Sequence, residues 1–206
     1  MYALVTDGTI TKYFSYPKGF TLGDNQYPAD IFMKWSVAEK EAIGIYEVVF
    51  DNTNKKDEQW YINTNQSFAF ADDVVTASYG TATAKAHADT LWTQEDIDNL
   101  DDAGNLTAGD IKTRGLKYNL IKNLKVNVAN ELAKTDWYIT RNTEKSVAIP
   151  SAISTHRDLV RTTQASIEAQ ITGAADTAAL ETLHTYTTDS EGVQSRPLGE
   201  LPTLEL

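Results

Sequence analysis

Cysteine is absent from this chain of 206 residues. Its absence excludes disulfide bonds, thiolate catalysis and cysteine-based zinc sites, and it leaves the redox compartment undetermined. Long apolar runs are absent too, because none approaches the ~20 residues that a membrane-spanning helix needs. Residues 1–7 lack the basic stretch followed by an apolar run that marks a signal peptide. We therefore expect a protein that is made in the cytoplasm and has no membrane partner.

Basic residues are few relative to acidic ones. Lysine and arginine number 18, and aspartate and glutamate number 29, which gives a formal net charge of −11. Binding to a nucleic-acid backbone or to an anionic membrane surface requires clustered positive charge. We therefore predict no nucleic-acid partner and interpret the acidity as a contribution to solubility.

Catalytic motifs are also missing. The three histidines, His87, His156 and His184, stand far apart and match no metal-ligand spacing. The sequence contains no glycine-rich phosphate loop, no nucleophile elbow and no HExxH motif. We expect no catalytic residue, no cofactor and no metal, and hence no enzyme. One enzymatic alternative stays open, a glycan hydrolase with two paired carboxylates, because carboxylates are plentiful.

Residues 1–84 predict a β-rich module with one short helix. Asp7-Gly8 is a typical hairpin turn, and further turn signals recur roughly every 8–12 residues, as in a small antiparallel sheet. Ser36 and Glu39 have the spacing of a capping box at the start of the helix. The tryptophans and tyrosines of this module form either a binding face or the core, and their position in short strands favours the core.

Residues 85–109 predict an acidic linker or a short helix that Thr93 caps. Their carboxylates resemble the composition of a calcium-binding loop. When Gly104 is placed at the turn position of such a loop, however, Ala103 replaces a ligand and Asp110 replaces the bidentate glutamate. We therefore favour a solvated acidic linker over a calcium site.

Residues 110–186 predict a helical hairpin domain, and residues 187–206 an extended tail that is ordered only if a neighbour holds it. At roughly 24 residues the first helix is long for a globular domain, so we expect it to pack along another long helix or a partner chain. Gly115 favours a close crossing of two helices. The apolar stripe of this helix, at steps of four residues, is Leu116, Leu120, Leu124, Val128 and Leu132.

The second helix of the predicted hairpin follows Pro150. Either Ser151 or Ser154 can cap it, and Asp176 can cap a last short helix after it. The predicted stripe of the second helix is Leu159, Val160, Thr163, Ile167 and Ile171.

The corner between the two long helices carries the residues that we single out as a structural corner, Asp136, Trp137, Arg157 and Arg161. Arg157 and Arg161 are four residues apart and share one helix face. They either bind an acidic partner or close the corner by pairing with Asp136 or Glu144 or by stacking on Trp137. We favour the second role, in which Asp136 and Arg157 form a pair that specifies the fold and Trp137 is a large anchor beside it.

Three segments around this corner resemble a motif of tailed bacteriophages. They are Leu132-Ala133-Lys134-Thr135-Asp136-Trp137-Tyr138, Val147-Ala148-Ile149-Pro150 and His156-Arg157-Asp158-Leu159-Val160-Arg161. In small tail-fibre assembly chaperones and related tail-associated proteins, a Leu-x-x-Thr-Asp-Trp corner precedes a proline loop and a Tyr-Arg-x-x-Leu-Arg helix. The resemblance spans residues 130–172. His156 replaces the tyrosine and Val160 the leucine, and the family's Trp-Pro ending after the second helix is absent. More loosely, residues 27–48 resemble the N-terminal modules of phage tail-region proteins.

We therefore predict an α+β protein, with a small N-terminal antiparallel β-rich module followed by a C-terminal helical hairpin. The resemblance implies a non-enzymatic structural component of a bacteriophage tail or tail-fibre region. Such a component is made in the host cytoplasm, is located in the virion tail and binds other virion or tail-fibre proteins. The alternative is a tail-fibre assembly chaperone that is absent from the mature virion. A homo-oligomer is compatible with both, because the long apolar stripe needs a partner surface.

Overall fold

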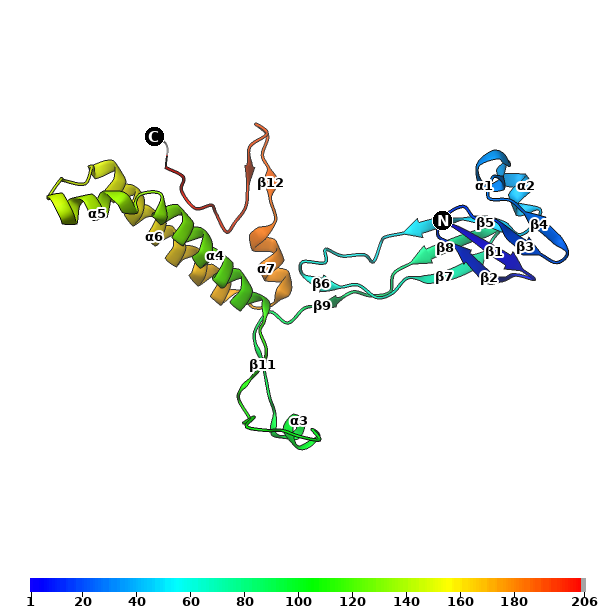
Figure 1. The fold of residues 1–206 in the computed structure, drawn as a ribbon, viewed down its shortest axis with the longest axis horizontal. Helices are drawn as coiled ribbons and strands as arrows, with labels where there is room; N and C mark the ends of the chain where they lie inside the picture. Colours follow the sequence, from blue (N-terminus) through cyan, green and yellow to red (C-terminus); the bar gives the residue numbers. More distant parts are fainter. Residues whose placement is uncertain (205–206) are drawn as a thin grey trace. The chain divides into compact units, whose positions relative to one another are not determined.

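The structure of the chain, a computed structural model, describes residues 1–204 (Figure 1). It contains two compact units, of which the first is Met1–Thr83 and the second begins at Ala84. Strands dominate the first unit and helices the second, so the chain has the predicted α+β fold. The boundary lies beside residue 84, where the sequence pattern places the end of the β-rich module.

The first unit is built on a five-stranded sheet with the strand order β2-β1-β5-β8-β7. The elements of this unit are β1 (Tyr2–Thr6), β2 (Thr9–Phe14), β3 (Phe20–Leu22), β4 (Asn25–Tyr27), α1 (Ile31–Lys34), α2 (Val37–Glu41), β5 (Ile45–Asp51), β6 (Tyr61–Ile62), β7 (Ser67–Ala71) and β8 (Val74–Ser78), with β9 (Thr83–Ala84) at the boundary. Neighbouring strands of the sheet are antiparallel, except that β5 and β8 are parallel. The predicted antiparallel sheet is therefore a mixed one, because the β7–β8 hairpin places its second strand beside β5.

Side chains that alternate along β1 belong to two separate apolar clusters of this unit. Leu4 packs in one cluster with Phe14, Phe20 and Phe32, whereas its neighbours along β1 pack in the other. The centroid of the Phe14 ring lies 5.0 Å from that of Phe20 and 5.3 Å from that of Phe32. These phenylalanine rings form part of the core.

The prediction that the tryptophans and tyrosines of this unit belong to the core holds only in part. Trp60 and Tyr61 are buried, whereas Tyr13 and Tyr16 are exposed.

The predicted capping box begins helix α2. The backbone N–H of Glu39 donates to Ser36 Oγ, and the Glu39 carboxylate accepts from the Ser36 backbone N–H. These reciprocal bonds satisfy two donors that the first turn of a helix otherwise leaves unpaired. The helix predicted at this position is confirmed, but α1 precedes it, so the prediction of a single short helix in this unit is wrong.

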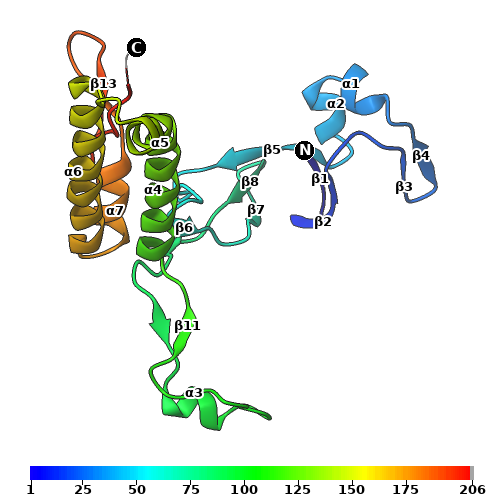
Figure 2. The same ribbon diagram turned by 60° about the vertical axis from the view of Figure 1, so that its left-hand side comes forward.

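The second unit contains two long helices, α4 and α6, which lie side by side in both views (Figures 1 and 2). Its elements are β10 (Thr90–Leu91), α3 (Gln94–Asp98), β11 (Ile111–Thr113), α4 (Leu116–Ala133), α5 (Asp136–Lys145), α6 (Ser151–Gly173), α7 (Thr177–His184), β12 (Thr187–Thr188) and β13 (Gln194–Ser195). α4 and α6 are antiparallel, because Lys117 bonds to Thr172 near one end and Glu131 contacts His156 near the other. The two long helices of the predicted hairpin are therefore present.

Several details of the predicted hairpin are wrong. The long helical pattern begins at Leu116 rather than at Asp110, because residues 111–113 pair as strand β11. The loop between the long helices contains the additional helix α5. Helix α6 follows Pro150 directly and has no side-chain cap, so neither Ser151 nor Ser154 caps it. Pro150 is the N-cap residue, and its carbonyl accepts from the backbone N–H groups of Ile153 and Ser154.

In residues 85–109 the predicted short helix capped by Thr93 is present as α3, whereas the alternative of a plain acidic linker is wrong because β10 pairs with β11. Strands β10 and β11 pair, and the capping box of Thr93 and Asp96 begins α3. Lys112 donates to Asp96 at 2.6 Å and lies over the ring of Trp92. Asp110, which a calcium loop would use as a ligand, instead accepts a hydrogen bond from the backbone N–H of Thr107.

Gly115 marks a close approach, but the contact is with a loop rather than with a helix. A Cβ atom at Gly115 would lie 2.3 Å from the backbone carbonyl of Ala88. The same loop satisfies the start of α4, because the N–H of Gly115 donates to Asp89 Oδ1 and the N–H of Leu116 donates to the carbonyl of Ala86. The absence of a side chain at residue 115 therefore allows the loop to cap the helix.

We predict that Gly115→Ala destabilises the second unit by about 1–3 kcal/mol, the range for overpacking in a close-packed site. The matched control is Gly173→Ala, since a Cβ at Gly173 meets nothing within 4 Å. That control should be neutral or slightly stabilising, because alanine favours helix. Denaturant unfolding of the full chain, followed by the helical circular-dichroism signal, measures both variants. Equal stability of the two variants would contradict this role of Gly115.

Candidate functional site

The guanidinium group of Arg157 joins α6 to the junction between α4 and α5. Its Nη1 atom donates to the carbonyl of Leu132 at 2.9 Å, to Thr135 Oγ1 at 2.7 Å and to Asp136 Oδ1 at 2.9 Å. Thr135 is fully buried, and Arg157 is nearly so. The last carbonyls of a helix have no partner within the helix, and Arg157 provides one for the end of α4. The corner is therefore closed by one cation, from the pair that the sequence analysis favours.

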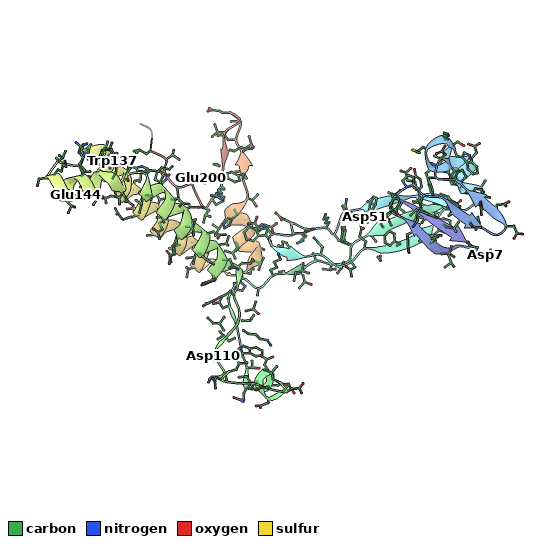
Figure 3. The ribbon with its side chains drawn as sticks, viewed as in Figure 1. Asp7, Asp51, Asp110, Trp137, Glu144 and Glu200 are labelled. Carbon is green, nitrogen blue, oxygen red and sulfur yellow. The ribbon has the colours of Figure 1, made fainter. Side chains whose placement is uncertain are left out.

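The other two corner residues do not take part in this network. Arg161 lies 3.5 Å from Asp158 in its own helix, and its side chain is 52% exposed. Trp137 is 50% exposed; its ring lies beside that of Tyr138, with the Arg141 guanidinium 5.6 Å from its centroid (Figure 3). The expectation of a large anchor is wrong for Trp137, because the chain continues as helix α5 and none of the residues of α5 is buried.

A second polar group at this corner, Glu131 with His156, was missed by sequence reasoning. His156 Nε2 lies 3.2 Å from Glu131 Oε1, and both side chains are buried. The ammonium group of Lys134, together with the backbone N–H of Leu204 and the His156 ring, holds the pKa of the Glu131 carboxyl below its usual value, against the opposing effect of burial. The sequence contained one signal for this buried pair, which is the charged residue Glu131 three positions after Val128 of the apolar stripe.

The C-terminal segment packs against the hairpin, which corrects the prediction of an extended tail held by a neighbour. Strands β12 and β13 form a small hairpin, and Leu198 beyond them is buried. The backbone N–H of Leu198 donates to the carbonyl of Leu183 in α7. A cavity of about 350 Å³ lies between this segment and the helices, lined in part by Leu124, Ile171 and Leu198. This side of the α4–α6 pair is therefore covered by the chain itself.

A different face of α4 is largely open, and the only ion pair that its lysines form in the described part of the chain is that of Lys125 with Glu168 of α6. A shallow groove of about 480 Å³ lies on it, and every lining residue belongs to this one helix. We call this surface the α4 strip; it consists of Tyr118, Ile121, Lys122, Lys125, Val126 and Ala129. Val126 is 52% exposed and Tyr118 41% exposed. Apolar residues that face solvent in a row mark a surface that a partner can cover.

The described residues contain no group of three or more histidine, aspartate or glutamate side chains that could hold a metal ion. Within the same residues, no helix is both long enough and apolar enough to cross a bilayer.

Burial lowers the pKa of His184, whose Nδ1 atom lies 2.8 Å from the carbonyl oxygen of Leu180 in the same helix. His184 is thus fixed to α7, and it lines the cavity next to the C-terminal segment.

Comparisons with protein-family models, with curated proteins and with solved structures find no match to this chain. Two features of the second unit therefore remain from which its function can be inferred. One is the buried corner around Arg157, and the other is the exposed α4 strip.

We predict that Arg157→Ala destabilises the second unit by about 2–3 kcal/mol, because it leaves the buried hydroxyl of Thr135 and the carbonyl of Leu132 without their cationic donor. The matched control is Arg161→Ala, four residues further along the same helix. Since Arg161 is exposed and its ion pair is long, its removal should cost less than about 0.5 kcal/mol. Denaturant unfolding of both variants checks the difference. Equal losses in the free energy of unfolding would show that Arg157 does not hold the corner together.

We predict that acid weakens the second unit through Glu131. A carboxyl whose pKa is lowered by folding stabilises the folded state above its unfolded pKa, and this contribution is lost as the pH falls through the folded-state value. The direction of the Glu131 shift therefore implies that wild type is more stable than Glu131→Gln near neutral pH. The difference in melting temperature should shrink below the ordinary glutamate pKa of 4.5. A difference that stays constant down to about pH 3 would contradict the assignment.

Proposed function

We propose that this protein is a non-enzymatic structural component of a bacteriophage tail or tail-fibre region, in which it binds other virion proteins. The observation that carries the proposal is the α4 strip, where Tyr118 and Val126 are exposed on a helix that already buries Leu124 and Val128 on another face. A helix in a monomeric protein normally turns its apolar residues to the core. An additional apolar row therefore supports a role in binding a partner.

The phage-like segments around the corner support the same proposal. The threonine and aspartate of the Thr-Asp-Trp corner and the arginine of the following helix meet in one hydrogen-bond network, through Thr135, Asp136 and Arg157. Such a network is a structural device that holds two helices at a set geometry, and it leaves the outer faces free for other proteins. The resemblance thus involves residues that join the two helices, whereas the α4 strip lies just outside the similar segments.

A tail-fibre assembly chaperone, the second candidate, also needs an exposed apolar surface, and the α4 strip is one. The two candidates differ in the fate of the protein. A structural subunit keeps its surface covered in the finished particle, whereas a chaperone uncovers it again on leaving. The presence of the protein in mature virions therefore separates them.

We predict that this chain is present in gradient-purified virions of the phage that encodes it, at a fixed ratio to the major capsid protein. Quantitative mass spectrometry of particles from repeated gradients measures that ratio. The control is a second, non-structural protein from the same infected lysate, which should fall to background in the particles. Abundance in the lysate together with absence from particles would overturn the structural role and support the chaperone.

A further inference from the structure

The α4 strip has the geometry of a binding site for one additional helix. Its residues form two rows at steps of four, Tyr118-Lys122-Val126 and Ile121-Lys125-Ala129. Rows of this spacing are the ridges by which helices pack, and the groove between two such ridges accepts a ridge of a second helix. From Tyr118 to Ala129 the strip is about 16 Å long. This length matches three turns of a partner helix.

The charges of the strip are positive, although the chain as a whole is acidic. Each ridge has a lysine at its centre and an apolar or aromatic residue at each end. Helix α4 carries three lysines and one glutamate, and that glutamate, Glu131, is buried at the corner. Lys125 is 3.1 Å from Glu168 of α6 but stays more than half exposed. At the N-terminal end of the strip, the guanidinium group of Arg114 lies 4.1 Å from the centroid of the Tyr118 ring.

We infer that the α4 strip binds an acidic amphipathic helix of another protein. A ridge that fits the groove has an apolar residue, then a glutamate or aspartate four positions later, and a second apolar residue four positions after that. The apolar ends cover Tyr118, Val126 and their neighbours, and the central carboxylate reaches Lys122 or Lys125. Charge complementarity of this kind selects the partner and its register. The inference rests on the proposed function and adds the chemical class of the partner.

A second copy of the same strip is the wrong occupant. Two strips packed face to face would bring Lys122 and Lys125 of one copy against the same lysines of the other. Like charges in contact oppose association and act as a device against the wrong partner. The strip therefore favours a different chain with acidic residues at the centre of its helix.

The test uses the full chain and two fluorescein-labelled synthetic peptides. Both are helix-forming peptides of about 18 residues with leucines at the two ends of one ridge; the central ridge position is glutamate in one and lysine in the other. We expect fluorescence anisotropy to show at least about 10-fold tighter binding of the glutamate peptide, weakening with added salt. The double variant Lys122→Glu, Lys125→Glu should reverse this preference. Such a reversal distinguishes a specific groove from general stickiness.

Two single variants complete the experiment. Val126→Asp, at one end of a ridge of the strip, should abolish binding of the glutamate peptide. The matched control is Leu159→Asp on α6, which is 51% exposed and lies outside the strip; it should leave binding unchanged. Both sites face solvent, so the circular-dichroism spectrum should be that of wild type in each case.

The inference is overturned by equal binding of the two peptides, by equal loss in the two aspartate variants, or by a dimer that Val126→Asp dissociates in analytical ultracentrifugation. These outcomes are independent of the virion measurement. Peptide selectivity with absence from particles would leave the acidic-helix surface in place and remove the structural role. Presence in particles without peptide selectivity would do the reverse.

Discussion

The guanidinium group of Arg157 is the constraint on which the helical unit depends. Its three hydrogen bonds reach the last turn of α4, the residue that precedes α5 and the first residue of α5. A single buried cation thereby determines where α4 ends and how close α6 lies to it. Because Thr135 is fully buried, water cannot replace the hydrogen bonds of Arg157 if that side chain is removed. Along the two helices, Leu124, Val160 and Ile171 are buried in this arrangement.

The two sides of the α4–α6 pair differ in how far the rest of the chain covers them. On one side the chain returns after α7 and buries Leu198, which completes an apolar core that two helices alone cannot enclose. On the side of the α4 strip nothing returns, and Val126 stays half exposed. A pair of helices has more surface than one returning segment can cover. The uncovered side is where an additional protein can contribute burial.

The net charge of the chain differs in sign from the local charge of the α4 strip. The chain has a net charge of −11, which argues against nucleic-acid partners for the protein as a whole. The α4 strip nevertheless has two lysines and no carboxylate among its residues. Attraction between charges in water extends only about a Debye length, roughly 8–10 Å. A partner helix therefore responds to the local lysines of the strip more than to distant acidic loops.

Local patterns in the sequence determined much of the fold. The capping box at Ser36, the cap at Asp176 and the long helical periodicity after Gly115 each depend on neighbours a few residues away, and each is present in the structure. The division beside residue 84 follows from the change to an alanine-rich and then acidic composition at that point of the sequence. The pair of Asp136 and Arg157 could be predicted because Asp136 lies in the predicted turn and Arg157 in the helix that was expected to fold back beside it.

Only the tertiary structure decided which apolar residues are covered. Trp137 and Leu159 belong to apolar-looking segments and are half exposed, whereas the charged Glu131 and its partner His156 are buried. Burial depends on which elements distant in the chain meet, and periodicity along one helix does not contain that information. The same reason explains why the sequence alone showed that α4 needs a neighbour but not which of its faces the chain itself would leave open.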